Sequence, residues 1–277
     1  MSSYKQPPNW QGWDQQRNKI TSSKGGWKIG EAVYNHGYSM MDDLIGQISW
    51  FQLLVLNTTG RLPNDKVATW LENCFSCLSW PDSRIWCNQV AALAGSTKAR
   101  PVAAVTAGIQ ASDALLYGPG VITHCLGFIQ QARQDVDQGK SLFDIIQKRQ
   151  GNTLSLPGYA RPIAKGDERV TAMYRLSREL GFDIGPHEAL AMEISEYLTK
   201  EEGESINFGG YMAAFLADQG FSNPDLSRLM ALWVSAGVQA CYAEASDNPA
   251  GYYLPLQCQD ITYTGALPRP LPKKPER

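Results

Sequence analysis

The sequence has no excess of charge of either sign. Its 25 lysines and arginines and 27 aspartates and glutamates leave a formal net charge of −2, and the two signs are interspersed along the chain. Proteins that bind nucleic acid need a concentrated basic surface that displaces counterions from the phosphates. We therefore expect no nucleic acid among the partners of this protein.

Long apolar runs are also missing. A membrane-spanning helix needs about 18 or more apolar residues in succession, and the most apolar stretch, residues 101–116, falls short of this. Four polar side chains interrupt it, namely Thr106, Gln110, Ser112 and Asp113. The stretch predicts a buried helix, and we expect no membrane partner. The polar N-terminus lacks the apolar centre of a secretory signal, so we expect a cytoplasmic protein.

Cysteine is sparse and scattered. Six cysteines in 277 residues do not have the dense, even spacing of a secreted disulfide framework, so we expect reduced thiols. Cys74 and Cys77 form a CxxC pair inside a helical pattern, with no second pair of ligands nearby. We favour small core residues over a metal site, and we expect no metal.

Alternating strand patterns are lacking as well, and the apolar periodicity is helical nearly everywhere. The first helical face comprises Leu44, Ile45, Ile48, Phe51 and Leu54. The segment 60–63 ends this helix, and 63–65 caps the next. Further helices are predicted over 66–80, 91–116, 167–180, 186–200, 207–219 and 224–245. Glu188, Glu193 and Glu196 are expected on a solvated face. The predicted fold class is all-α.

Glycine and proline punctuate the chain at two places. The stretch 151–166 is too rich in both to be helical, so it separates two helical halves and is the natural place for a functional loop. The Pro-rich tail, residues 266–277, has too little apolar content to fold alone. It is either an arm over a partner subunit or disordered. Residues 1–26 are expected to form an N-terminal arm.

Four segments, in a fixed order, carry a resemblance to a known family. They are GYSMMDDLIGQISWFQLLVLNTTGRLP, ALLYGPG, LPGYARPIAKGDERV, and INFGGYMAAFLADQGF followed by LMALWVSAGVQACYAEAS. The first resembles the "GY…DLIG…SF.E…LLTGxLP" opening of the citrate synthase and citryl-CoA lyase superfamily, and the third its "GxGHPVYKxxDPR" loop. The last is similar to its "NVDxxxxxxLxxLG" and "GxxAHxxEQ" segments. The resemblance spans about residues 27–265, and the short length is more like the citryl-CoA lyases.

The resemblance implies a citrate synthase-like multihelical fold, with a large helical domain and a smaller mobile part over about 151–230. It also implies a homodimer whose cleft binds a CoA thioester and a carboxylated small molecule, with no tightly bound cofactor. In the family, one histidine polarises the thioester carbonyl, an aspartate moves the α-proton, and a second histidine handles the keto-acid oxygen. An enolate intermediate needs such a base and such a donor.

The sequence departs from the family at all three of these positions. An ungapped match places Val121 at the first histidine, and only a three-residue insertion would bring His124 there. Arg161 stands at the second histidine, and Gly209 at the aspartate. The catalytic set would therefore have to be rebuilt, and His124, Arg161 and Glu244 are our catalytic candidates. Asp113 and Tyr211 are further possible proton carriers. A sister subunit supplying the missing residues stays open.

Other matching positions are retained. Arg169 matches the arginine that grips a substrate carboxylate in a bidentate way, and we expect Asn207 and Tyr211 to contact the substrate with it. Glu244 matches a late glutamate of the family, although Cys241 replaces the histidine three residues before it. The loop that contacts CoA in relatives is represented here by Gly158, Tyr159, Ala160 and Lys165.

Arg161 has two interpretations. A guanidinium stays charged at neutral pH, so it can stabilise an enolate or bind a carboxylate, but it cannot shuttle a proton as histidine does. Alternatively, Arg161 neutralises a neighbouring carboxylate such as Asp167.

Three functions follow from these residues. The favoured one is an enzyme that makes or breaks a carbon–carbon bond in a carboxylated acyl-CoA, with an altered acid/base set. The second is a pseudoenzyme that keeps the fold and binds a ligand or a partner protein. The third is another reaction in the same cleft, such as hydrolysis or isomerisation of an acyl-CoA.

Overall fold

The computed structural model describes residues 15, 17–18, 20–115, 117–150, 156–161, 164–252 and 257–271. Most of the predicted N-terminal arm, part of the Gly- and Pro-rich loop and the end of the Pro-rich tail lie outside these residues. The chain forms two compact units. Unit 1 comprises Met1–Trp80 and Ser112–Val234, and unit 2 comprises Pro81–Ala111 and Ser235–Arg277. The smaller part predicted over 151–230 falls wholly within unit 1, and its mobility stays a prediction.

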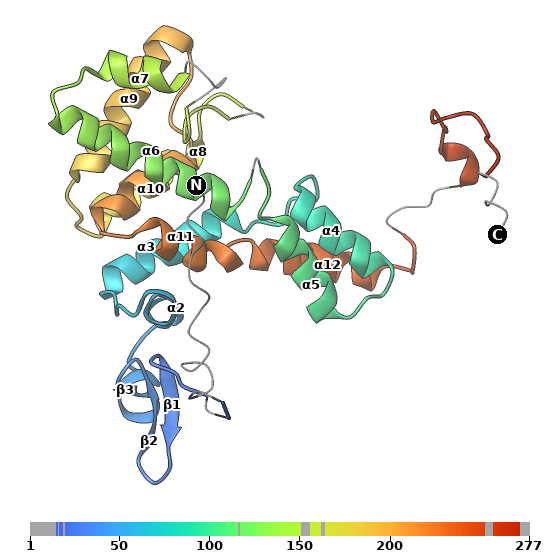
Figure 1. The fold of residues 1–277 in the computed structure, drawn as a ribbon, viewed down its shortest axis with the longest axis horizontal. Coiled ribbons are helices and arrows are strands. Elements are labelled where there is room, and N and C mark those ends of the chain that lie inside the picture. The colour runs from blue at the N-terminus through green and yellow to red at the C-terminus, as the bar shows by residue number, and fades with distance from the viewer. Residues whose placement is uncertain are drawn as a thin grey trace, which may run out of the picture. The chain divides into compact units, whose positions relative to one another are not determined.

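Helices dominate both units, so the predicted all-α class is confirmed (Figure 1). Unit 1 contains α2 (Trp50–Thr59), α3 (Asp65–Leu78), α6 (Pro119–Asp137), α7 (Leu142–Gln150), α8 (Glu168–Glu179), α9 (Pro186–Glu202), α10 (Phe208–Asp218) and α11 (Asn223–Leu229). It also contains a π-helix, Met40–Leu44, and a 3-10 turn, Met230–Leu232. Unit 2 contains α4 (Trp86–Ser96), α5 (Pro101–Ala111), α12 (Ser235–Asp247) and a 3-10 turn, Cys258–Asp260. None of the described helices combines the length and the apolar character that a bilayer crossing would require.

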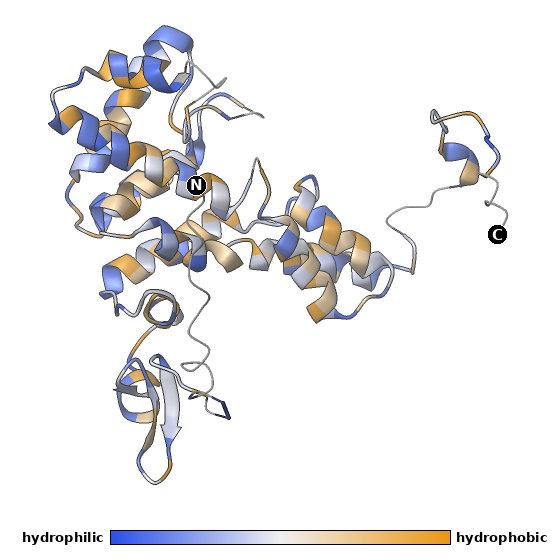
Figure 2. Cartoon of the chain, in the orientation of Figure 1, coloured by the Kyte–Doolittle hydropathy of each residue, from blue (hydrophilic) through white to orange (hydrophobic). Residues whose placement is uncertain are grey.

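Helix α10 is the centre of unit 1. It packs against α6, α8 and α9, and its residues from Gly210 to Ala217 are all buried. Figure 2 shows that most of its ribbon has the colours of hydrophobic residues. A helix that is apolar on every side must be surrounded by other elements. The ring of Phe215 stacks on Trp70 of α3, with 4.0 Å between the centroids. Asn207 caps the helix by accepting a hydrogen bond from the Gly210 amide, at 3.1 Å.

Unit 2 is held together by small residues. Helices α4, α5 and α12 pack so closely that a Cβ added at Gly108 would lie 2.6 Å from Val238 Cγ1 and 2.8 Å from the Cys87 carbonyl. Pro101 begins α5, where a proline fits because it lacks the N–H that would be unpaired there. The helix predicted over 91–116 is nevertheless two helices, since the chain turns between Ser96 and Pro101. The prediction of a buried helix is wrong here, since within α5 only Ala104 and Gly108 are buried and Val102 is 80% exposed.

A small antiparallel sheet precedes the helices, although no strand was predicted. Its strands are β1 (Gly25–Lys28), β2 (Ala32–Asn35) and β3 (Tyr38–Ser39). Trp27 pairs with Val33, and Asn35 pairs with Tyr38. The strands are two to four residues long and mostly exposed or half-buried, so no alternation of apolar and polar residues marks them.

The helical face predicted from Leu44 to Leu54 is also interrupted. The π-helix ends at Leu44, and α2 begins only at Trp50. Ser49 starts α2 with a capping box, in which its hydroxyl accepts from the Gln52 amide at 3.2 Å and its own amide donates to Gln52 Oε1 at 2.8 Å. Downstream, the predicted boundaries are confirmed: Gly60 ends α2 in a left-handed conformation, and Asn64 caps α3. The helix predicted over 224–245 is likewise divided, because α11, the turn at Met230–Leu232 and α12 replace it.

Candidate functional site

The loop at residues 158–161 is tied to the segment that leads into α10. The amide of Ala160 donates to the Ser205 carbonyl at 3.0 Å, and the amide of Asn207 donates to the Gly158 carbonyl at 2.9 Å. The Asn207 side chain adds a third bond, from Nδ2 to the Ala160 carbonyl at 2.8 Å. Ala160 adopts a left-handed conformation, with φ of 67°, which is rare for a residue with a Cβ. These bonds fix the point from which Arg161 projects.

Two glycines allow this close approach. A Cβ added at Gly210 would lie 2.3 Å from the Gly158 carbonyl oxygen, and one at Gly158 would lie 2.6 Å from the Gly210 Cα. The loop backbone therefore rests directly on the first turn of α10. Gly158 also has φ of 88°, which strongly favours glycine.

Tyr159, predicted to contact CoA, points into the protein. It is 5% exposed, and its hydroxyl donates to the Ala191 carbonyl of α9 at 3.0 Å. Burial raises the pKa of this hydroxyl well above its usual value. Tyr159 thus anchors the loop to the core.

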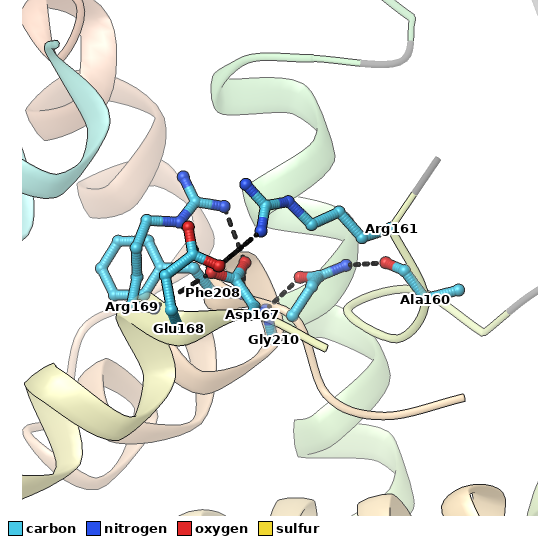
Figure 3. Close-up of polar contacts among 8 residues, drawn as sticks. Ala160, Arg161, Asp167, Glu168, Arg169, Phe208 and Gly210 are labelled. Carbon is cyan, nitrogen blue, oxygen red and sulfur yellow. Dashed lines mark hydrogen bonds and ion pairs between the residues drawn. The ribbon is translucent and has the colours of Figure 1, made fainter. Parts of the chain in front are cut away.

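Asp167 is the hub of the polar contacts beside this loop (Figure 3). Its side chain is completely buried, and it accepts from Arg169 Nε at 2.8 Å and Arg169 Nη2 at 2.7 Å. It also accepts from the Phe208 amide at 2.9 Å, which joins the start of α8 to the start of α10. Burial alone would raise the pKa of Asp167, but the Arg169 donors, the Phe208 amide and the charge of Arg161 outweigh it and hold the pKa below its usual value.

Both arginines of the predicted site converge on Asp167. Arg169 binds it through a bidentate pair, and its guanidinium lies over the Phe208 ring, 5.3 Å from the centroid. Arg161 places Nη1 3.8 Å from Asp167 Oδ1 and 2.8 Å from Glu168 Oε2. The structure therefore brings together three of the candidate residues, Arg161, Arg169 and Asn207. Of the two interpretations of Arg161, carboxylate neutralisation is the one that these contacts show.

Glu168 is the site residue that sequence reasoning missed. Acidic residues are common in the first turn of a helix, so a glutamate at the first position of α8 does not stand out in the sequence. One signal was present: Glu168 stands where the family pattern has proline, and Arg161 stands where it has histidine. The two departures from the pattern meet in an ion pair.

The position of the missing aspartate stays without a carboxylate. A Cβ at Gly209 would lie 3.2 Å from Asn207 Oδ1 and 3.2 Å from Ile122 Cδ1, so α6 faces this position with an apolar side chain. His124 is exposed on α6, with no polar partner among the described residues, and Val121 is half-buried. The structure does not bring His124 to Gly209.

The remaining candidates are Tyr211, Lys165, Glu244 and Asp113. Tyr211 is fully buried, and its hydroxyl lies 3.0 Å from Ser177 Oγ and donates to Glu188 Oε1 at 3.1 Å. Lys165 is exposed near Gly203. Glu244 is exposed on α12 in unit 2. Asp113 accepts a long bond, 3.4 Å, from the Gly120 amide.

The prediction of a solvated face for Glu188 is wrong, although Glu193 and Glu196 are exposed as predicted. Glu188 is 1% exposed and pairs with Arg178 of α8, whose Nη2 lies 2.9 and 2.8 Å from its two oxygens. Burial raises the pKa of Glu188, in opposition to the effect of Arg178. Spacing along one helix could not show this, because the partner is on another.

Of the CxxC pair, Cys74 belongs to the core, as favoured, whereas Cys77 is half-buried. Cys74 is completely buried, with its sulfur 3.0 Å from Met212 Sδ, and burial raises the pKa of its thiol well above the usual value. No group of three or more metal-binding side chains gathers in the part of the chain that the structure describes.

Comparison with known proteins places this architecture. No protein-family model matches the sequence, and no curated protein matches it. Among solved structures, citryl-CoA lyase from Hydrogenobacter thermophilus matches with a TM-score of 0.78 and 23% identity, over 91% of this chain and 97% of that one. The chain has a citrate synthase-like fold.

Two further solved structures share the citrate synthase-like fold. ATP citrate lyase from Methanothrix soehngenii, in complex with citrate and coenzyme A, matches with a TM-score of 0.76 and 16% identity, over 94% of this chain and 45% of that one. Citrate synthase from Thermotoga maritima matches with a TM-score of 0.61 and 18% identity, over 81% and 60%. The fold predicted from the four sequence segments is therefore confirmed.

Proposed function

We propose that this protein is a citryl-CoA-lyase-like enzyme, which makes or breaks a carbon–carbon bond in a carboxylated acyl-CoA. The observation that carries the proposal is the convergence of Arg161 and Arg169 beside the loop at 158–160, at the start of α10. The likeness to citryl-CoA lyase over 97% of that chain adds support. The loop backbone and Lys165 would contact CoA, and the arginines and Asn207 would hold the carboxylated part of the substrate. We also propose that the protein acts as a homodimer.

The chemistry asks for two kinds of group. Cleavage takes the proton from the substrate hydroxyl, breaks the bond to the α-carbon and leaves a thioester enolate, which then accepts a proton. Arg161 and Arg169 can stabilise the developing negative charge, because preorganised donors act strongly in a site that excludes water. Neither can move the proton at neutral pH. His124 and Glu244 remain our proposed proton carriers.

A second function has its own supporting observation. Gly209 offers no carboxylate, His124 is exposed, and both arginines already pair with carboxylates of the chain. A pseudoenzyme that binds a ligand or a partner without turnover is consistent with these facts. The test must therefore separate binding from catalysis.

The first experiment is calorimetric titration with CoA and acetyl-CoA, with and without oxaloacetate, followed by an assay of acyl-CoA release from 3-hydroxy-3-carboxyacyl-CoAs. We expect the thioester to bind and an acyl-CoA to be released.

Arg169→Lys keeps the charge but loses the bidentate fork, and we expect turnover to fall at least about tenfold, or about 1.4 kcal/mol. Arg175→Lys, on the exposed face of α8, is the matched control. Binding without release would favour the pseudoenzyme. No thioester binding at millimolar ligand would overturn the enzyme proposal and leave the pseudoenzyme as a partner-binding protein.

A further inference from the structure

The two arginines beside Asp167 do not bind it equally closely. Two guanidinium groups, from Arg161 and Arg169, face one fully buried carboxylate. Arg169 takes both oxygens of Asp167 in a bidentate pair, so Arg161 reaches that carboxylate only at 3.8 Å. The closer partner of Arg161 is Glu168, at 2.8 Å. The neutrality of this cluster thus depends on Glu168.

The two carboxylates differ sharply in environment. Asp167 accepts from Arg169 Nε, Arg169 Nη2 and the Phe208 amide, and its side chain is 0% exposed. Glu168 is 76% exposed, and its one side-chain partner among the described residues is Arg161. An ion pair with one member in solvent adds little stability, because water competes for the charge and the side chain loses freedom. Arg161, by contrast, is only 14% exposed.

We propose that Arg161 is the receiving group for a carboxylate of a small di- or tricarboxylate, and that Glu168 occupies this guanidinium until the ligand displaces it. The inference rests on the proposed function, because the ligand would be the carboxylated substrate of the same site. Glu168 is then an internal competitor that sets the affinity for that ligand. Asp167 stays in place and keeps Arg169 and the start of α10 fixed while the exchange occurs.

The exchange has a consequence for selectivity. A guanidinium and a carboxylate form a planar, bidentate pair. Only a ligand with its own carboxylate can therefore replace the ion pair that Arg161 loses when Glu168 leaves. A neutral acyl group would leave Arg161, which is largely shielded from water, without a counterion. Glu168 therefore discriminates against uncarboxylated ligands.

The test is calorimetric titration of the full chain with citrate as the probe, in the wild type and three variants. We expect Glu168→Gln to tighten citrate binding by roughly fivefold, the effect of one unit charge a few ångströms away in a solvated environment. Arg161→Gln should weaken binding, and the double variant should bind no more tightly than Arg161→Gln alone. Glu179→Gln removes the same charge from the exposed end of α8 and should change the affinity by less than about twofold, because salt screens distant surface charges.

Two results would overturn the exchange. One is an unchanged or weaker citrate affinity in Glu168→Gln, which would make the carboxylate a fixed part of the site. The other is the absence of citrate binding in both the wild type and Glu168→Gln. A cooperative thermal unfolding transition in each variant is the control that the variant is folded. CoA titration separates this inference from the proposed function: CoA binding without the citrate effect rejects the exchange alone, and the citrate effect without CoA binding rejects the enzyme alone.

Discussion

The hydroxyl of Tyr211 shows how one residue can look functional in sequence and serve the core in the structure. It lies between Ser177 Oγ at 3.0 Å and Glu188 Oε1 at 3.1 Å, and Ser177 also accepts from Trp70 Nε1 at 2.9 Å. Burial raises the pKa of Tyr211, so the hydroxyl stays protonated and donates to Glu188. A buried polar chain of this kind is stable only when every member is paired.

Tyr211→Phe should therefore destabilise the protein by about 1–2 kcal/mol, because it removes a partner from both Ser177 and Glu188. We expect CoA affinity to stay unchanged. Urea unfolding measures the first effect, and calorimetric titration measures the second. Tyr197→Phe on α9, a half-buried tyrosine without a polar partner among the described residues, is the control and should stay within about 0.5 kcal/mol of the wild type. Weaker CoA binding with unchanged stability would return Tyr211 to the ligand site.

Some partners of the candidate site residues could be predicted from the sequence and others could not. Arg161 and Asp167 could be paired in advance, because they are close in the chain and opposite in charge. The pairing of Glu188 with Arg178 could not, because it depends on how α8 and α9 cross. The same holds for the Phe208 amide and Asp167, which lie 41 residues apart.

Between elements, the contact of the loop at 158–160 with α10 depends on the absence of two side chains. Gly158 and Gly210 meet backbone to backbone, and close packing leaves no room for a methyl group on either. This contact is the base on which Arg161 and Asn207 are placed.

Gly210→Ala should cost about 1–3 kcal/mol, since the loop must move away from the helix to admit the Cβ. The expected loss outweighs the gain of about 1 kcal/mol that alanine usually brings to a helix. Gly127→Ala in α6 is the matched control, because its Cβ would lie 3.7 Å from the nearest side chain and should fit. Urea unfolding midpoints compare the two. Equal stability of both variants would show that the Gly158–Gly210 contact does not limit the space beside α10.

The element boundaries that the sequence predicted are those with local chemistry. Gly60, Asn64 and Pro101 each act through their own backbone or side chain, so their roles can be read from a few neighbours. The strands and the break before Trp50 could not be predicted in this way. The strands are too short to show an alternation of apolar and polar residues. At Ser49–Gln52 the apolar pattern continues without a break, so it hides the capping box that starts α2.

Across unit 1, two buried carboxylates link the helices and connect its stability to pH. Asp167 joins α8 to α10. Asp218, the last residue of α10, accepts from the His187 amide at 3.0 Å, the Glu188 amide at 2.8 Å and His187 Nδ1 at 2.7 Å. Burial acts to raise the pKa of both carboxyls, but their hydrogen bonds and neighbouring charges outweigh it, and both pKa values are lowered.

The sign of the pH effect follows from those shifts. Because the folded pKa lies below the unfolded one, each carboxylate contributes stability above about pH 4, the ordinary value for aspartate, and the contribution is lost as the pH falls further. We expect the thermal midpoint to drop steeply below this pH.

Asp218→Asn should be less stable than the wild type at neutral pH, by about 2 kcal/mol, and less sensitive to acid. Asp183→Asn, at an exposed position without a polar partner among the described residues, should keep the acid sensitivity of the wild type. Melting curves of the three proteins between neutral and acid pH provide the comparison. An unchanged acid transition in Asp218→Asn would place the titrating groups elsewhere.

The pairing of residues 158–160 with 205–207 has one more consequence. The chain between these two segments, which contains α8 and α9, therefore begins and ends at the same place in the structure. The distance in space between Arg161 and Asn207 is then independent of how many residues separate them along the chain. Residues can therefore be inserted or removed between α8 and α9 while the side chains of Arg161 and Asn207 keep their spacing.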